Sequence, residues 1–293
     1  MRYGEELEMT KTPIDEPTKS AELTKIALEV RKDVVRMLGV ARSYGLESAL
    51  AVADILVYLY WGCMDTSPTE KKNLRGDRFV LSKSSALPTL YACLAHKGYF
   101  GREELWSYRR LGSMLQGYPD IRTPGIDASG GLYGCGVGIA NGLCLANRID
   151  GVDSSVFCLM GESDFCEGVV WESLHLAVRN ALGRLVLIVD ANADDPPQLR
   201  DLRDAASLYI KLESFGWYVT EADGHDFSSL QRALDGMSPD DGRPKALIAR
   251  TNNGAVEDFL HKNGNGGSRP ISKDDMDQVL SILDAESRRN GVH

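Results

Sequence analysis

The stretch that decides the fold is residues 154–192, SSVFCLMGESDFCEGVVWESLHLAVRNALGRLVLIVDAN. Its two ends, 154–160 and 185–190, are short apolar runs with β-branched residues, which is typical of buried strands. Between them, residues 165–182 repeat apolar side chains at helical spacing and therefore predict a helix. A strand, a helix and a strand joined by short connections predict two parallel strands of one sheet, with the helix crossing one face.

The chain outside this stretch continues the alternation of strands and helices. Further strands are expected at 78–82, 217–222 and 246–251, and helices at 20–38, 46–62, 86–98, 102–111, 137–148, 200–215, 226–237 and from Ser272 onward. Glycine-rich loops are expected at 112–136 and 252–271, the second as a mobile loop or lid. The pattern predicts an α/β fold in which a doubly wound, mostly parallel sheet carries helices on both faces. Residues 1–20 are expected to form a flexible tail and residues 21–293 one domain, because no clear linker divides them.

Composition and charge exclude several classes of protein. The 293 residues are 43% hydrophobic and 26% charged, which is ordinary for a globular chain. The formal net charge of −9 argues against a general binder of nucleic acid or anionic membranes, since both need a positive face. No apolar run is expected to approach the roughly 18 residues that span a bilayer. The polar, acidic residues 1–20 hold no signal core, so we expect a cytoplasmic protein. Its six cysteines form no CxxC pair and are expected to be free thiols.

Polar residues follow the two strands of the deciding stretch, at the edge where doubly wound sheets bind their ligands. Glu162 comes directly after the first strand, and Asn192 follows the second strand thirty positions later. Neighbouring tips would bring together a carboxylate and an amide oxygen, which suit a hard cation such as Mg²⁺ that is shared with phosphates. The helix N-terminus near Ser163–Phe165 would present backbone N–H groups to the same phosphate. Acidic residues at strand ends are also often helix caps, so the residues alone leave both interpretations open.

The stretch from Gly161 to Asn192 resembles the thiamine-diphosphate motif of transketolases. That motif begins Gly-Asp-Gly, continues through Glu-Gly and a helix, and closes with Asn after the next strand. Other segments resemble transketolases in the same order, at 31–56, 77–83, 111–120, 123–136 and 214–226. The resemblance covers residues 22–290 and corresponds to the amino-terminal, diphosphate-binding half of the family's usual chain. It implies the family's thiamine-diphosphate-binding fold, with thiamine diphosphate and Mg²⁺ as cofactors, or Ca²⁺ or Mn²⁺ in place of Mg²⁺.

The resemblance assigns roles to individual residues. Glu162, Asn192 and the backbone carbonyl of Asp194 are expected to bind the metal ion. Glu167 matches an acid that links the two active sites of the family's dimer, so it is the expected catalytic residue; a carboxylate favoured at a helix start is the alternative. The residues expected on the cofactor, which include the family's glycine loop, are Ser85, Gly131, Gly134, Gly136, Gly161, Glu162, Ser163 and Asn192.

The chain departs from the family's pattern where transketolases carry histidines. The family's Gly-His-Pro, Ser-Lys-Gly-His and second Gly-His-Pro are replaced by Tyr44-Gly45-Leu46, Ser82-Lys83-Ser84-Ser85 and Gly117-Tyr118-Pro119. A fourth family histidine falls near Gly266, and Gly-Glu-Ser replaces Gly-Asp-Gly at the metal motif. Those histidines contact cofactor phosphate and sugar hydroxyls in the family. Their loss implies a donor, an acceptor or both that differ from ordinary sugar phosphates.

Five histidines remain in the chain. His96, His175 and His225 are expected to be structural, whereas His261 lies in the expected lid, where it could reach a ligand. His293 is the last residue. None of them stands where the family places a histidine that contacts substrate.

The resemblance implies a two-carbon transferase that is incomplete by itself. The glutamate that activates thiamine diphosphate lies on the family's other half, so a C-terminal-half partner subunit is expected, in an α2β2 assembly. The first hypothesis is transfer of a ketol unit from a ketose or ketose phosphate donor. The second is a hybrid of transketolase and the first component of pyruvate dehydrogenase, which passes an acyl unit to a lipoyl or carrier-protein thiol in secondary metabolism. The third is a degenerate, non-catalytic paralogue, against which Glu162, Glu167 and Asn192 argue. Neither nucleic acid nor a membrane is expected as a partner.

Overall fold

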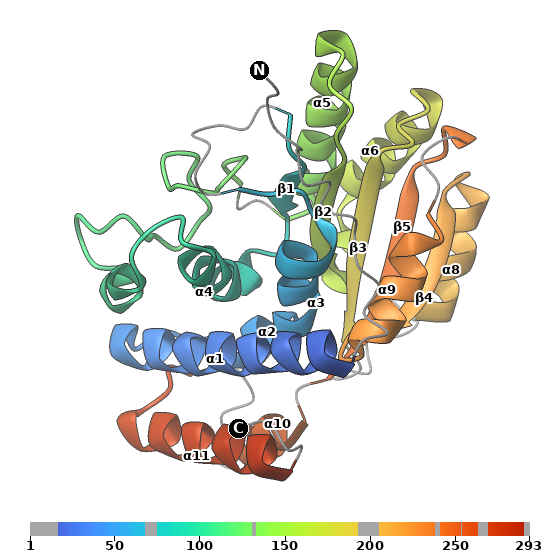
Figure 1. Cartoon of the computed structure of the whole chain (residues 1–293). Helices are drawn as coiled ribbons and strands as arrows, with labels where there is room; N and C mark the ends of the chain where they lie inside the picture. Colours follow the sequence, from blue (N-terminus) through green and yellow to red (C-terminus); the bar gives the residue numbers. More distant parts are fainter. Residues whose placement is uncertain are drawn as a thin grey trace, which may run out of the picture.

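The computed structural model describes residues 17–67, 75–130, 133–192, 205–237, 241–252, 254–262 and 269–289. Within this part of the chain, a five-stranded sheet runs in the order β1-β2-β3-β5-β4, and every neighbouring pair is parallel. The strands are β1 (Arg78–Leu81), β2 (Val156–Gly161), β3 (Leu185–Asn192), β4 (Tyr218–Asp223) and β5 (Lys245–Thr251). The predicted doubly wound α/β sheet is confirmed, with helices on both of its faces (Figure 1).

The strands send alternate side chains into two apolar cores, as a sheet that is covered on both faces requires. In β3, Val186 and Ile188 join the first core, whereas Leu185, Leu187 and Val189 join the second. This explains why 185–190 reads as one continuous apolar run. Both faces of the strand are buried, so the sequence shows no alternation of apolar and polar residues.

The helices divide between the two cores. Against the first core pack α1 (Pro17–Ala41), α2 (Leu46–Leu50), α3 (Ala53–Tyr58), α4 (Leu87–Lys97), α9 (Phe227–Asp235), α10 (Gly254–Lys262) and α11 (Lys273–Arg289). Against the second core pack α5 (Cys135–Asp150), α6 (Gly168–Arg179) and α8 (Ala205–Ser214). Figure 1 shows α11 stacked outside α1, as an additional layer.

Two predicted helices have a different local form. The expected helix 46–62 is two short helices, α2 and α3, separated by a buried turn at Ala51 and Val52 and followed by a π-helix at Leu59–Cys63. This segment is apolar on all sides, so packing rather than residue spacing decides where it bends. The expected helix 102–111 is a 3₁₀ helix at Arg102–Ser107, which is a usual form for so short a connection.

The first helix begins earlier than predicted. It starts at Pro17, so Pro17–Ser20 belong to α1 and not to the expected tail, and residues 1–16 lie outside the described residues. Proline suits the first turn of a helix, where its missing N–H costs nothing.

The expected lid at 252–271 contains a helix, α10, and is therefore not a loop throughout; residues 263–268 lie outside the described residues. The predicted helix start at Ser272 is confirmed by a reciprocal cap. Ser272 Oγ accepts a hydrogen bond from the Asp275 N–H at 3.1 Å, and the Asp275 carboxylate accepts one from the Ser272 N–H at 2.9 Å.

The prediction that no apolar run reaches membrane length is wrong, because one segment has both the length and the mean hydropathy that a membrane span needs. The 18 residues Leu46–Cys63 have a mean hydropathy of 1.4 and are long and apolar enough to cross a membrane. In the fold, 72% of this window is buried inside the protein, as in a core helix.

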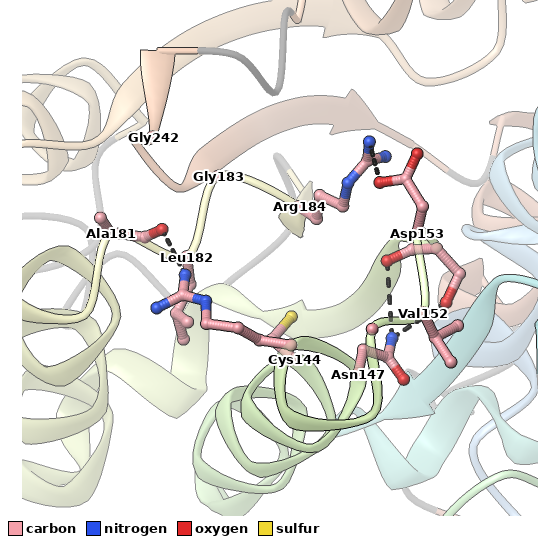
Figure 2. A pocket seen from close by; sticks show the side chains of 12 residues that line it. Cys144, Asn147, Val152, Asp153, Ala181, Leu182, Gly183, Arg184 and Gly242 are labelled. Atoms are coloured by element: carbon pink, nitrogen blue, oxygen red, sulfur yellow. Dashed lines mark hydrogen bonds and ion pairs between the residues drawn. The ribbon is translucent and has the colours of Figure 1, made fainter.

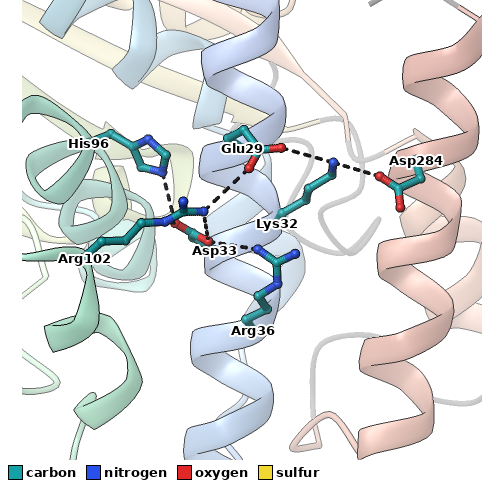
Figure 3. Close-up of polar contacts among 7 residues, drawn as sticks. All are labelled: Glu29, Lys32, Asp33, Arg36, His96, Arg102 and Asp284. Carbon is teal, nitrogen blue, oxygen red and sulfur yellow. Dashed lines mark hydrogen bonds and ion pairs between the residues drawn. The ribbon is translucent and has the colours of Figure 1, made fainter. Parts of the chain in front are cut away.

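Hydrogen bonds and ion pairs of charged side chains connect α1 to the elements around it (Figure 3). Asp33 is fully buried and accepts hydrogen bonds from Arg102 Nη2 at 2.7 Å and from His96 Nε2 at 3.0 Å. On the other side of the helix, Lys32 forms an ion pair with Asp284 of α11 at 2.8 Å. Burial by itself would raise the pKa of Asp33, but the hydrogen bonds from His96 and Arg102 lower it. His96 thus has a structural role, as predicted.

Candidate functional site

The topology creates two switch points at the carboxyl edge of the sheet. A crevice forms where adjacent strands send their following helices to opposite faces. The helix after β1 is α4, on the first core, whereas the helix after β2 is α6, on the second. The same holds for β3, which is followed by α8, and β5, which is followed by α10. The polar residues singled out in the sequence lie at these two points.

Glu162 and Asn192 lie on neighbouring strand tips. The register pairs Gly161 with Asp190, so Glu162 stands one residue and Asn192 two residues beyond this pair. Glu162 opens a 3₁₀ helix and is 8% exposed, and Asn192 is half-buried as the last residue of β3, not directly after it. Carboxylate and amide oxygens are donors that Mg²⁺ accepts, so the pair fits a metal ion that further oxygens complete.

Two residues that were assigned to the site, Gly131 and Asp194, lie outside the described residues. The described part of the chain contains no group of three or more His, Cys, Asp or Glu side chains that could hold a metal ion. A metal ion at this edge would therefore rest on the carboxylate of Glu162, the amide of Asn192 and oxygens of other kinds, such as backbone carbonyls and cofactor phosphates.

Sequence reasoning missed a cation at the same edge. Lys83 follows β1, and its ammonium group forms an ion pair with Asp190 in β3, so the side chain reaches across the tip of β2. Gly161 lies at that tip, where an added Cβ would be 3.7 Å from Lys83 Cδ. Thr251 Oγ1 donates to the other oxygen of Asp190 at 2.5 Å, which joins β5 to the network. The signal in the sequence was an acid inside an apolar strand, since a buried carboxylate requires a partner.

Gly134 and Gly136, two of the glycines predicted near the cofactor, let the start of α5 pack closely against α6 and the segment after β1. A Cβ on Gly136 would lie 2.4 Å from Ser82 Cβ. Gly134 has a φ of 73°, and a Cβ there would lie 2.6 Å from a methyl group of Val170. Packing inside the chain therefore requires both glycines, and it brings the N-terminus of α5 to the carboxyl edge.

Asp164 is a buried acid that accepts hydrogen bonds from the ends of β1 and β2 and from the start of α5. Its carboxylate accepts a hydrogen bond from Ser82 Oγ at 2.9 Å and further ones from the backbone of Gly161 and Gly134. Burial raises the pKa of Asp164, although these hydrogen bonds oppose the shift. The tips of β1 and β2 and the start of α5 thus share one acceptor.

Glu167 occupies the N-cap of α6, but its side chain makes no capping hydrogen bond. It is exposed and lies beside Gly134, where an added Cβ would be 3.1 Å from Glu167 Cβ. Its position at the start of α6 fits both the predicted catalytic role and a carboxylate that the helix dipole favours. Ser163 and Ser85 are also exposed, in the first turns after β2 and β1.

One arginine, Arg109, packs against both loops that replace the family's Gly-His-Pro segments, the loop of Tyr44 and the loop of Tyr118. Arg109 Nη1 donates to Ser43 Oγ at 2.9 Å, and its Cζ lies 6.0 Å from the ring centroid of Tyr44. Arg109 Nε would lie 3.3 Å from a Cβ on Gly117, the neighbour of Tyr118. Both tyrosines are exposed. The two loops, far apart in the sequence, therefore lie side by side.

These loops reach the carboxyl end of β1. Pro119, next to Tyr118, accepts a hydrogen bond from the Gly130 N–H at 3.3 Å. A Cβ on Gly130 would lie 3.4 Å from the carbonyl oxygen of Leu81, the last residue of β1. Tyr118 thus stands on the β1 side of the site, near the segment that carries Lys83.

A cavity of about 350 Å³ lies at the opposite, amino-terminal edge of the sheet (Figure 2). Arg184, directly before β3, forms an ion pair with Asp153 there. Arg148 of α5 donates to the carbonyl oxygens of Asn180 and Ala181, each at 2.7 Å. Both guanidinium groups are therefore used within the fold. Because doubly wound sheets bind their ligands beyond the carboxyl ends, this cavity is not the candidate site.

The fold and the site define a doubly wound α/β protein whose carboxyl edge presents oxygen donors, a lysine and helix N-termini, the groups that suit a phosphorylated ligand with a metal ion. The chain belongs to the transketolase family, because the family model described as the transketolase, thiamine diphosphate binding domain, matches residues 30–289. The resemblance stated from the sequence is thereby confirmed.

Individual relatives differ in how much of their length the chain covers. Transketolase-like protein 2 of Mus musculus is 31% identical over 93% of this chain and 45% of its own length. One of the subunits of the apulose-4-phosphate transketolase of Phocaeicola vulgatus is 29% identical over 78% of this chain and 82% of its own length. The structure of a transketolase from Campylobacter jejuni superposes with a TM-score of 0.74 and 25% identity over 91% of this chain and 47% of that one. The chain spans less than half the length of the transketolase-like proteins that it matches.

Proposed function

We propose that this chain is the N-terminal, cofactor-binding subunit of a split transketolase-like enzyme that transfers a two-carbon ketol unit from a ketose or ketose phosphate donor. The observation that carries the proposal is the pairing of Glu162 and Asn192 on adjacent strand tips, with Lys83 at the same edge. The split arrangement is supported by the relative from Phocaeicola vulgatus, which is named as a single subunit and 82% of which the chain covers.

The residues of this chain would bind and orient the cofactor. Glu162, Asn192 and the carbonyl of Asp194 would hold Mg²⁺, and Lys83 would offset the charge of the diphosphate. Backbone N–H groups near Ser163 would donate to the phosphate oxygens. Thiamine diphosphate, when bound, supplies the nucleophilic carbon at which the two-carbon unit is transferred. The chain itself would supply binding and charge compensation.

The missing part of the chemistry would come from a partner. The resemblance assigns the activating glutamate to a C-terminal-half subunit, so this chain is expected to be inactive alone. Glu167 is exposed at the start of α6, which suits a carboxylate that links the two sites of an assembled enzyme.

An α2β2 assembly needs a surface where two copies of this chain meet, and we propose the outer face of α6. Val169 and Leu176, two helical turns apart on one face, are 38% and 41% exposed. Glu167 begins the same helix, so docking of a second copy here would bring the two carboxylates toward one another.

A second candidate function is transfer of an acyl unit to a lipoyl or carrier-protein thiol in the cytoplasm. It is favoured by Tyr118, which stands exposed where the family places a histidine that contacts sugar hydroxyls, and by Gly45, which replaces another of these histidines without a side chain. The phenol of Tyr118 offers one hydroxyl and an apolar ring, so the acceptor need not be a sugar. The core reaction at the cofactor would be shared by both candidates.

The test begins with copurification of the tagged chain from its native cells and mass spectrometry of the proteins that remain bound. A stoichiometric partner that resembles the C-terminal half of transketolases is the expected result. Calorimetry should then show thiamine diphosphate binding to the complex that depends on Mg²⁺. A chain that only self-associates and does not bind thiamine diphosphate would instead be the degenerate paralogue. With the complex in hand, an assay of a ketose phosphate donor with and without carrier protein separates the two transferase reactions.

A further inference from the structure

His225 makes two hydrogen bonds that determine which ring nitrogen carries the proton. Its Nε2 accepts from the backbone N–H of Asn252 at 3.0 Å, because an amide N–H can only donate. Its Nδ1 lies 2.8 Å from Asp54 Oδ2. A neutral imidazole with an unprotonated Nε2 carries its proton on Nδ1, so this nitrogen donates to Asp54.

The acceptor of that proton is held as a carboxylate. Arg31 forms a two-pronged ion pair with Asp54, with Nη1 at 2.9 Å from Oδ1 and Nη2 at 2.5 Å from Oδ2. Burial by itself would raise the pKa of Asp54, but Arg31 and His225 outweigh it and hold the pKa at about 2. Asp54 therefore remains ionised at neutral pH and fixes the orientation of the imidazole.

The hydrogen bond to Asn252 holds the end of a strand that reaches the candidate site. Asn252 directly follows Thr251, the last residue of β5. Thr251 donates to Asp190, which is also the partner of Lys83. A continuous series of contacts therefore crosses the carboxyl edge of the sheet. It begins at Arg31 of α1 and ends at Lys83 after β1, and it passes in order through Asp54, His225, Asn252, Thr251 and Asp190.

We propose that His225 is a positioning residue, whose neutral, Nδ1-protonated imidazole pins the carboxyl end of β5 at the cofactor edge and releases it when the ring is protonated. Protonation leaves the Nδ1–H hydrogen bond to Asp54 in place. It converts Nε2 from an acceptor into a donor, which then faces the Asn252 N–H, another donor. The contact to β5 is lost while the contact to α3 persists.

Solvent can reach the ring. His225 is 25% exposed and lines a cavity of about 460 Å³ between α1, α11 and the ends of β4 and β5. Arg31 and Glu286 also line this cavity, from α1 and α11. The charged groups around the ring are the guanidinium of Arg31 and the carboxylates of Asp54, Asp223, Asp226 and Glu286. The imidazole is therefore accessible to solvent in the folded chain.

Two substitutions separate the functions of the two nitrogens. His225→Gln places an amide oxygen near the position of Nε2 and so keeps an acceptor for Asn252 that does not titrate between pH 5 and 8. His225→Asn keeps a donor near the position of Nδ1 for Asp54 but cannot reach Asn252. Thermal unfolding at pH 8 identifies a variant that fails to fold, in which case the pH titration of the unaltered protein is the deciding measurement.

The experiment is NMR spectroscopy of the full chain without cofactor, which keeps it independent of the proposed function. We expect imidazole ¹⁵N shifts of the Nδ1–H tautomer at pH 8. Protection of the Asn252 amide against hydrogen exchange, corrected for the intrinsic rate, should fall roughly tenfold between pH 8 and pH 5.5. His225→Gln should abolish that pH dependence, and His225→Asn should leave the amide unprotected at both pH values. An Nε2–H tautomer, or protection that does not respond to pH, overturns the proposal.

The consequence for the cofactor edge rests on the proposed function and is measured separately. In the assembled complex, affinity for Mg²⁺ and thiamine diphosphate should weaken at acidic pH in the unaltered protein and less in His225→Gln. If the complex does not bind thiamine diphosphate at any pH, the proposed function fails while the NMR result on His225 stands. If it binds with the same pH dependence in both proteins, His225 does not position the site.

Discussion

Asp33 of α1 and Asp54 of α3 are carboxylates that the fold buries, and each is kept ionised by the cations around it. The cations that meet Asp33 are Arg36 and Arg102, and the cation that meets Asp54 is Arg31. Removal of one member of a buried ion pair leaves an uncompensated charge, which costs far more than the pair contributes. The free energy of unfolding should therefore respond strongly to substitutions at these two buried carboxylates.

Replacement of Asp33 tests this sensitivity. Asp33→Asn should lower the free energy of unfolding by about 1–3 kcal/mol, because the buried side chain loses its charged hydrogen bonds while the guanidinium groups of Arg36 and Arg102 stay partly in solvent. Asp284→Asn, at the exposed end of the same network, is the matched control and should cost less than about 1 kcal/mol. Urea unfolding of both variants measures the difference. Equal losses would mean that burial of Asp33 does not determine its contribution.

The pKa of Asp54 predicts how stability depends on pH. Its folded-state pKa is about 2, below the ordinary value of 3.8, so its contribution is present at neutral pH and is lost as pH falls from about 4 to about 2. The contribution amounts to about 2 kcal/mol. Urea unfolding at pH 7, 4 and 3 should show a loss that begins below pH 4, and it should be smaller in Asp54→Asn than in the unaltered protein. An equal loss in both would exclude Asp54 as the source.

The metal assignment is tested at Glu162 and Asn192. Asn192→Ala removes an oxygen ligand and should weaken Mg²⁺-dependent binding of thiamine diphosphate to the assembled complex at least roughly tenfold. Glu162→Asp shortens the side chain to the family's residue and should preserve or tighten binding. Calorimetry at fixed Mg²⁺ gives both affinities. Unchanged affinity for Asn192→Ala, or complete loss for Glu162→Asp, would contradict the assignment.

The N-terminal part of α5 shows how a helix is placed at the site. Gly136 allows the helix to approach the end of β1 closely, because a Cβ would lie 2.4 Å from Ser82 Cβ. Gly142 lies on the same helix, and a Cβ there would have no atom of the described residues within 4 Å, beyond the neighbouring backbone of the helix itself. Close packing therefore requires glycine at position 136 but not at position 142, although the sequence alone does not distinguish them.

Substitution of these two glycines separates close packing from helix propensity. Gly136→Ala should lower the free energy of unfolding by about 1–3 kcal/mol, because α5 must move away from β1. Gly142→Ala should leave it unchanged or raise it by about 0.5–1 kcal/mol, since alanine reduces the freedom of the unfolded chain. Chemical denaturation gives both values, and a shared sign would contradict the packing argument.

For the whole molecule, the exposed apolar residues Val169 and Leu176 of α6 lie on the surface that we propose as the interface between two copies of this chain. Leu176→Asp should convert the proposed α2β2 assembly into an αβ pair, because a charge is placed in the interface between two copies of this chain. Val40→Asp is the matched control: Val40 is 45% exposed, close to the 41% of Leu176, but lies on α1 across the sheet. Sedimentation of each complex gives its mass. Loss of assembly in both variants, or in neither, would exclude this face as the interface.

Most of the fold could be predicted from the sequence because its signals are local. The period of the apolar residues distinguished strands from helices, and the Ser272 cap was visible as a residue pattern. The segment 46–62 could not be resolved, since a helix that is apolar all round carries no information about where it bends. The helix α10 was not predicted, because the glycines around it indicated a loop.

The candidate site also contains both kinds of feature, those that a local sequence pattern predicts and those that it does not. The adjacency of Glu162 and Asn192 followed from one strand–helix–strand unit, so it could be predicted before the structure. The contacts of Lys83 with Asp190, of His225 with Asn252 and of Arg109 with Tyr44 join residues that are far apart in the chain. No local pattern indicates such pairs, because they depend on which strands become neighbours.

The sequence by itself determined that this protein is a parallel α/β protein of the transketolase family, and it predicted a ligand edge after the strands expected at 154–160 and 185–190. Only the tertiary structure decided the strand order β1-β2-β3-β5-β4, in which β5 lies between β3 and β4. That order places Thr251 beside Asn192 and Asp190, and it brings His225 to the end of β5. The physical reason is that side-chain periodicity records whether a strand is buried, whereas the choice of neighbour is made by the packing of whole elements.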